Sequence, residues 1–356
     1  MKLFACDHCG NTVYFENASC GRCGHTLGYR SDKNALVSLV QEGNTWSSST
    51  FPDEPYVFCE NAKHSACNWL IRATPGGDPF CAACRHNDTI PDISDPLNLS
   101  RWQVIERAKK RLFYSLLRLD LPLQTRASNP EHGLSFRFLA DTPVAKERVL
   151  TGHDNGIITI ALIEADDAER EARRTSMGEP YRTLLGHFRH EIGHHYWDLL
   201  VDGRAPLGEF RRLFGDETLD YGEALEAHYA NGAPAGWSQN FISSYATCHP
   251  WEDFAETFAH YLHIVDTVEM ASSFGVHARV DGQDADLSIQ TGFVPYTAPD
   301  AQTIVDNWVP LASMLNNLNR AMGHPDAYPF VLTPPVIEKL SFIHQLVHRQ
   351  WHLGGH

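Results

Sequence analysis

The segment His190-Glu191-Ile192-Gly193-His194 combines two imidazoles and a carboxylate at a spacing that can support metal chemistry. On an α-helix, residues four apart project within about 40° of one another, one turn along. Both imidazoles can then meet one Zn²⁺, with the Glu191 carboxylate beside an open coordination position. Two histidines leave a catalytic zinc one protein ligand short, so the motif predicts a third ligand elsewhere in the chain.

A second polar face lies downstream, where Glu252, Glu256 and His260 recur every four residues. Pro250 suits the first position of a helix that would carry all three. A carboxylate on this face could complete a His₂Glu site, and the next one could orient a ligand imidazole from behind. The alternative is a solvated acidic face.

Other polar side chains compete for roles at this centre. Glu223 and Glu226 are rival third ligands, with a solvated helix face as the alternative reading. Asp198 could hold an imidazole in its metal-binding tautomer or be an ordinary helix carboxylate. His195 projects about 140° away from His190, so we expect it to pack in the core.

The motif needs a helix, and the sequence from Tyr181 to Leu200 predicts one. Its apolar residues fall opposite His190 and form a stripe that can be buried while the histidines face a cleft. The stripe consists of Tyr181, Leu185, Phe188, Ile192 and Leu199.

These residues resemble the gluzincins, zinc metallopeptidases with HExxH and a downstream helix glutamate. The resemblance is closest to the catalytic domain of anthrax lethal factor, in which the ligand glutamate opens a Glu-Phe-Phe-Ala-Glu-Ala-Phe segment. Residues Glu252 to Phe258 match it at five of seven positions, and Tyr245 lies seven residues before Glu252. The resemblance implies Glu252 as third ligand, Glu256 as the carboxylate behind the ligands and Tyr245 as the oxyanion stabiliser.

The reaction expected from this centre is hydrolysis of a peptide or protein substrate. Zinc held by His190, His194 and Glu252 would activate a water and polarise the scissile carbonyl. Glu191 would take the proton of that water, and Tyr245 would donate a hydrogen bond to the oxyanion. The alternative is a zinc-stabilised protein-binding module without turnover, although a purely structural site has no need of Glu191.

Eight of the nine cysteines precede residue 85, and the first four form two CxxC pairs, each followed by glycine. Two such CxxC pairs can direct four thiolates at one tetrahedral Zn²⁺, and this arrangement resembles a zinc ribbon. A disulfide pair or a thioredoxin-like redox site finds no support in a secretion signal or a βαβ pattern. The predicted ligands are Cys6, Cys9, Cys20 and Cys23.

A second set, Cys59, Cys67, Cys81 and Cys84, predicts another structural zinc, although its first spacing is irregular. His64 or His86 could replace one of these cysteines, and four reduced thiols in a small core are the alternative. Because a site with four protein ligands is closed, such ions fold the chain rather than catalyse. The cysteine-rich head could also bind a protein partner.

Local patterns predict the remaining elements. We expect strands near Thr12–Phe15 and Ile157–Leu162 and a helix from Ser100 to Leu119 with a solvated basic face. Two more helices are expected over Thr303–Met322 and Pro335–Trp351, and a linker over Gln41–Pro55.

The whole chain resembles a bacterial family called "putative zinc-binding metallopeptidases" with an N-terminal zinc ribbon. The expected fold is α+β, a mainly helical zincin-like domain preceded by small zinc-ribbon-like β modules. The expected divisions are a zinc ribbon in residues 1–30, a linker with a second cysteine-rich zinc module in residues 31–96, and the metallopeptidase domain in residues 97–356.

The net charge of −15 argues against nucleic acid as a partner, because phosphate binding needs clustered positive charge. Residues 1–100 hold 7 Lys and Arg against 11 Asp and Glu, a net charge of −4, so the head is no exception. The sequence shows neither an apolar run long enough for a membrane span nor the apolar core of a signal peptide. We therefore expect a cytoplasmic protein without a membrane partner.

Overall fold

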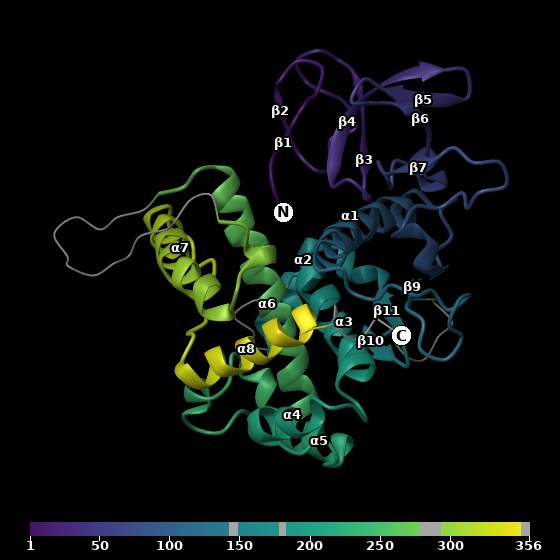
Figure 1. Ribbon diagram of the computed structural model, residues 1–356. Helices are drawn as coiled ribbons and strands as arrows, with labels where there is room; N and C mark the ends of the chain where they lie inside the picture. The colour runs from purple at the N-terminus through teal and green to yellow at the C-terminus, as the bar shows by residue number, and fades with distance from the viewer. Residues whose placement is uncertain (142–148, 178–182, 278–292, 350–356) are drawn as a thin grey trace. The chain divides into compact units, whose positions relative to one another are not determined.

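The computed structural model describes residues 1–141, 149–177, 183–277 and 293–349 (Figure 1). The chain forms two compact units, the first made of residues 1–117 and 122–170 and the second of residues 118–121 and 171–356. Tyr181 and Trp351, two of the predicted helix ends, lie outside the described residues.

The first unit begins with β1 (Phe4–Ala5) paired antiparallel to β2 (Thr12–Val13). A five-stranded antiparallel sheet follows in chain order: β3 (Thr26–Arg30), β4 (Ala35–Glu42), β5 (Thr45–Ser48), β6 (Phe51–Phe58) and β7 (Leu70–Arg72). Its core contains Val37, Leu39, Tyr56 and Leu70.

The linker predicted over Gln41–Pro55 is wrong, because this segment contains β5 and much of β6. Trp46 lies opposite Tyr56 in the register, and it packs edge to face on Phe58 with ring centroids 5.5 Å apart. Cross-strand aromatic pairs of this kind stabilise a sheet. They outweigh the loop preference of the serines between them.

A second sheet of the first unit has the order β10-β11-β9-β8. Its strands are β8 (Asn87–Thr89), β9 (Ser135–Leu139), β10 (Gly152–Asp154) and β11 (Ile157–Ala161). Strand β9 runs parallel to both β8 and β11, and β11 confirms the strand predicted after residue 156. Because β8 pairs with β9, the first compact unit continues past residue 96. The domain boundary that the sequence places there stays a prediction.

Helix α1 (Pro96–Arg118) starts earlier than predicted, because Asp95 rather than Ser100 accepts a hydrogen bond from the first turn, at 2.8 Å from the backbone N of Leu97. The prediction of a solvated basic face is also partly wrong. Lys109 and Lys110 are buried, since both ammonium groups pair with the buried Glu106 carboxylate, at 2.8 and 2.6 Å.

The second unit is helical, and α2 (Asp167–Met177) spans the division between the units. Its helices are α3 (Leu184–Leu200), α4 (Leu207–Phe214), α5 (Tyr221–Asn231), α6 (Pro250–Ser273), α7 (Ala301–Ala321) and α8 (Pro334–Arg349). Helix α6 contacts α3, α4, α7 and α8, and its buried Phe254 and Phe258 belong to an aromatic core with Phe210, Phe214 and Tyr196. Helices α7 and α8 confirm the two predicted near the C-terminus.

Short 3₁₀ turns connect these elements: Glu60–His64, Cys84–His86, Leu162–Ala165, Trp237–Gln239, Tyr245–Thr247 and Pro295–Thr297. Together, the sheets of the first unit and the helices of the second confirm the α+β class. Among the described residues, no helix is both long and apolar enough to cross a membrane.

Candidate functional site

Helix α3 presents the HExxH motif as the sequence predicts. Thr183 caps its N-terminus, where the side chain accepts a hydrogen bond of 2.9 Å from Gly186 N. Phe188 and Ile192 are fully buried, and His195 is buried as well, in contact with the Tyr196 ring. One side of the helix is therefore anchored in the core, and the motif histidines can face a partner helix.

Helix α6 begins at Pro250, as predicted, with His249 as its N-cap. His249 Nδ1 accepts a hydrogen bond of 3.1 Å from the backbone N–H of Trp251. This cap places Glu252 in the first turn, where its side chain is 1% exposed. A carboxylate so buried needs positively charged or metal partners to remain ionised.

Gly193 allows α3 and α6 to approach closely enough to share a site. A Cβ atom at this position would lie 2.9 Å from the Cα of Ala255, a distance that real Cβ atoms do not tolerate. The middle of the HExxH motif therefore contains the residue that the helix contact requires.

Three acceptor atoms from the two helices converge on one point. His190 Nε2 lies 3.1 Å from His194 Nε2 and 2.9 Å from Glu252 Oε2, and His194 Nε2 lies 3.5 Å from the same oxygen. Atoms bonded to a tetrahedral zinc at about 2.0–2.1 Å lie roughly 3.3–3.4 Å apart. The separations fit such an ion, and among the described residues Glu252 Oε2 has no hydrogen-bond partner.

Glu256 lies behind these three atoms. Its Oε1 accepts a hydrogen bond of 2.8 Å from His190 Nδ1, because a carboxylate can only accept. The Ser243 hydroxyl donates to its other oxygen at 2.6 Å. This hydrogen bond keeps a proton on Nδ1, so that Nε2 is the nitrogen left to bind a metal once its own proton is displaced.

The electrostatics of the site favour a cation. Burial opposes ionisation of Glu252, but the two motif histidines outweigh it and hold the pKa of this carboxyl well below its ordinary value. Burial likewise opposes ionisation of Glu256, but chiefly the hydrogen bond from His190 lowers its pKa to about 2. Burial disfavours the imidazolium of His190, yet both carboxylates raise its pKa well above the ordinary value. The Glu252 and Glu256 carboxylates therefore remain charged near neutral pH, facing the motif histidines.

Aromatic side chains border the same site. Trp251 packs against His194 with ring centroids 3.7 Å apart, and the Tyr245 ring lies 5.9 Å from that of His190. Burial and the charge of Glu252 raise the pKa of both Tyr245 and Tyr221, so both hydroxyls stay protonated and can donate hydrogen bonds. Glu191 is buried and follows His190 on the same turn of α3.

The rival ligands lie elsewhere. Glu223 and Glu226 are exposed on α5, outside the group formed by His190, His194 and Glu252. Asp198 lies one turn after His194, where burial and the nearby Asp202 raise its pKa to about 7. Its contact with an imidazole stays a prediction.

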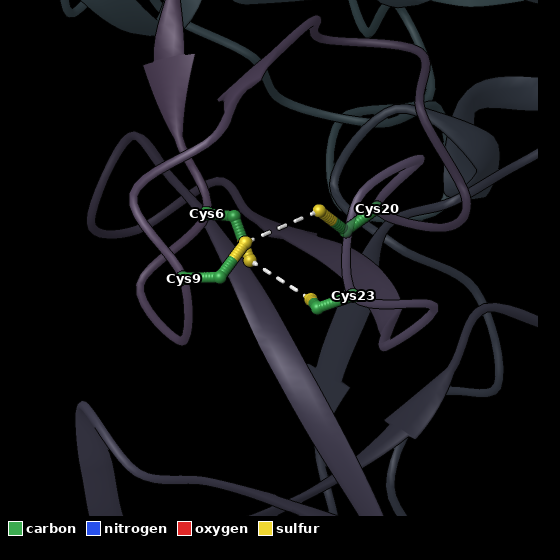
Figure 2. A group of neighbouring side chains, drawn as sticks. All are labelled: Cys6, Cys9, Cys20 and Cys23. Atoms are coloured by element: carbon green, nitrogen blue, oxygen red, sulfur yellow. Dashed lines mark hydrogen bonds between the residues drawn. The ribbon is translucent and has the colours of Figure 1, made fainter.

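The four cysteines of the first CxxC pairs lie between β1 and β3 along the chain. Their sulfurs are directed toward one another (Figure 2). Cys6 Sγ lies 3.8 Å from Cys23 Sγ, and Cys9 Sγ lies 3.6 Å from Cys20 Sγ. These separations are far too long for disulfides and match the roughly 3.8 Å expected between thiolates bonded to one tetrahedral zinc.

The second cysteine group also comes together, despite its irregular spacing. All four sulfurs lie within 4.8 Å of one another, and Cys67 Sγ lies 3.8 Å from Cys81 Sγ. Lys110 Nζ donates to Cys84 Sγ at 3.1 Å. His86 is engaged elsewhere, with Nδ1 at 2.9 Å from the Leu134 carbonyl, and the His64 ring faces Trp102. The four cysteines therefore form the group without either histidine.

Two contacts at the His₂Glu site escaped the sequence analysis. The Tyr221 hydroxyl donates to Glu252 Oε1 at 2.7 Å, and Ser243 supports Glu256 as described above. Neither residue has a fixed spacing to HExxH, so no local pattern indicates it. The one sequence feature that could have drawn attention to Ser243 is its place two residues before Tyr245, in the segment that leads into α6.

Comparisons with known proteins agree with this division of sites. A family model described as "zinc-ribbon domain" matches residues 3–95, and one described as "Putative zinc-binding metallo-peptidase" matches residues 98–346. Relatives from Mycobacterium tuberculosis and Mycobacterium bovis, each named only as an uncharacterised protein, are 42% identical over 349 residues, which are 98% of this chain and 95% of each relative. No solved structure matches this chain. The family descriptions and the cysteine clusters together support zinc binding.

Proposed function

We propose that this chain, which belongs to the family described as "Putative zinc-binding metallo-peptidase", is a zinc-dependent hydrolase of peptide bonds. The observation that carries the proposal is the convergence of His190, His194 and Glu252 next to Glu191. Within the described part of the chain, this group has three potential ligands and no fourth. Three protein ligands leave one position of a tetrahedral zinc for water, as catalytic sites require.

Each residue of the site has a chemical role in this proposal. A zinc ion bound by the three side chains would lower the pKa of a bound water toward about 7 and polarise the scissile carbonyl. Glu191 accepts the proton of the water and delivers it to the leaving amine. Tyr245, protonated and close to His190, donates a hydrogen bond to the oxyanion. Glu256 holds the ligand tautomer of His190.

We also propose that the second unit is a zincin-like domain of the gluzincin type. The spacing of HExxH, Tyr245, Glu252 and Glu256 supports this assignment, and so does the pairing of α3 with α6 around the site. The two cysteine groups would each hold one structural zinc in a closed, four-thiolate site.

The decisive experiment compares the full chain with its Glu191→Gln variant on a mixed peptide library. We expect the variant to retain its zinc, because Glu191 is not a ligand, and to lose about 10²–10⁴-fold in turnover. Zinc content and cleavage products would be measured on the same samples. Equal hydrolysis by both proteins would refute the role of Glu191, and no cleavage by the zinc-loaded parent chain would favour the non-catalytic binding module.

A further inference from the structure

The two carboxylate oxygens of Glu252 face different partners. Oε2 lies 2.9 Å from His190 Nε2 and 3.5 Å from His194 Nε2. Oε1 accepts the hydrogen bond of 2.7 Å from the Tyr221 hydroxyl. Because a phenolic proton occupies one oxygen, the carboxylate is divided into an oxygen held by protein and an oxygen directed at the histidines.

Tyr221 is well placed for this contact although its helix is not buried. None of the eleven residues of α5 is buried, and Tyr221 itself is 38% exposed. Its ring lies edge-on to His249 and Trp251, with centroids 5.5 and 5.8 Å away. His249 Nε2 donates to the Leu219 carbonyl at 3.1 Å, which ties the chain before α5 to the N-terminus of α6.

We propose that Tyr221 is a positioning residue of the metal centre, whose hydroxyl restricts Glu252 to coordination through Oε2 alone. This inference rests on the proposed zinc site, and not on peptide hydrolysis. A second oxygen on the ion would fill the position that the proposed reaction reserves for water. Tyr221 therefore differs from Tyr245, whose ring lies against His190 and to which we assign the oxyanion.

Zinc affinity tests the inference directly. The full-length Tyr221→Phe variant keeps the aromatic ring and loses only the hydroxyl. We expect it to bind zinc at the His₂Glu site about 10–100-fold more weakly, as is typical when the partner of a metal ligand is removed. The affinity would be measured by competition with a chromophoric chelator, and the ion of this site is the one that the Glu252→Ala variant lacks. Tyr229→Phe, at a position of α5 that is 60% exposed, should leave the zinc affinity unchanged.

The same Tyr221→Phe change in a chain that already carries Glu252→Gln distinguishes a positioning role of the hydroxyl from a general effect on helix packing. In a Glu252→Gln chain, the further change Tyr221→Phe should weaken the residual zinc binding less than it does in the parent chain, because a hydrogen bond to a neutral amide is weaker than one to a carboxylate. Unchanged affinity in Tyr221→Phe, or an equal loss in the Glu252→Gln background, would overturn the inference. Since no substrate is involved, a chain that shows the expected affinities but cleaves no peptide would refute the proposed function and leave the role of Tyr221 intact.

Discussion

The two compact units solve the problem of stability in different ways. The first relies on short strands around two groups of four cysteines, whereas the second packs helices around the aromatic core of α6. A small sheet buries too little apolar surface and usually needs disulfides or metals. A helical core as extensive as that of the second unit has no such need. The difference agrees with our proposal that metal is structural in the first unit and available for chemistry in the second.

The two cysteine groups also differ in the charge around them. The second group receives the Lys110 ammonium, at 3.1 Å from Cys84 Sγ, in a buried setting shared with Glu106. The side-chain contact to the first group comes from a neutral amide, Asn11 Nδ2, at 3.9 Å from Cys20 Sγ. Four thiolates around Zn²⁺ carry excess negative charge, so the buried group needs the lysine more than the partly exposed group does.

The largest effect is expected from removing a ligand of the buried group. Cys81→Ser should eliminate one bound zinc and unfold much of the first unit, because structural zinc supplies on the order of 10 kcal/mol of folding free energy. Zinc analysis and hydrogen exchange would measure both losses. Cys248→Ser is the matched control, since Cys248 lies outside both cysteine groups. An unchanged zinc content in Cys81→Ser would contradict the assignment.

The buried lysine gives the next largest effect. Lys110→Met removes a cation that neutralises Glu106 and contacts Cys84. Breaking a buried ion pair costs about 3–5 kcal/mol when the remaining charge is left alone. We expect the lower end of this range, because Lys109 still pairs with Glu106. Denaturant unfolding should show a loss of this size in the first unit. Arg107→Met, an exposed residue on the same helix, should change the free energy of unfolding little. Equal stability of the two variants would show that Lys110 does not support the cysteine group.

In the second unit, we expect helix packing to contribute more than metal binding to the free energy of unfolding. Gly193→Ala places a methyl group 2.9 Å from the Cα of Ala255 and forces α3 away from α6. Overpacking of this kind costs about 1–3 kcal/mol, and the displaced histidines should also bind zinc more weakly. Thermal unfolding and zinc titration would measure the two effects.

Gly208→Ala is the matched control for this substitution. Gly208 also lies in a helix, and a Cβ there meets no atom within 4 Å. The change should stabilise the chain by about 0.4–1 kcal/mol, because alanine restricts the unfolded state. If Gly193→Ala behaved like the control, the close contact between α3 and α6 would not be needed for the site.

Sequence reasoning anticipated which side chains come together where that grouping follows local spacing. HExxH, the two CxxC pairs and the Pro250 start of α6 depend on residues within a turn or two of one another. Glu252 required a resemblance, because the packing of two helices, and not spacing, brings it to His190.

The failures have the same physical origin. The Tyr221 hydroxyl reaches a carboxylate 31 residues away, and no periodicity encodes that contact. The burial of Lys109 and Lys110 depends on what covers α1, although Glu106 and Lys110 have the i,i+4 spacing of an ion pair. The serines of the predicted linker favoured a loop, but the segment forms strands because β5 pairs with β6, with Trp46 opposite Tyr56.

The smallest expected effect concerns pH and again separates the units. His344 on α8 is 4% exposed, and its Nδ1 lies 2.9 Å from the Tyr261 hydroxyl. Burial, together with nearby His348, lowers the pKa of His344 to about 4. Because this value is below that of the unfolded chain, the fold favours the neutral imidazole. Its stabilisation is complete above about pH 6.5 and disappears as the pH falls toward about 4.

Between pH 7.5 and pH 5, protonation of His344 should lower the free energy of unfolding of the second unit by at most about 2 kcal/mol. Thermal unfolding at the two pH values would show a larger loss for the parent chain than for His344→Gln, which cannot be protonated. His132→Gln, at a position that is 62% exposed in the first unit, should keep the parent's pH dependence. If His344→Gln showed the same acid sensitivity as the parent, buried carboxylates or metal loss would have to explain it. If metal loss proved to be the cause, the second unit would depend on its metal as the first does, against the comparison drawn above.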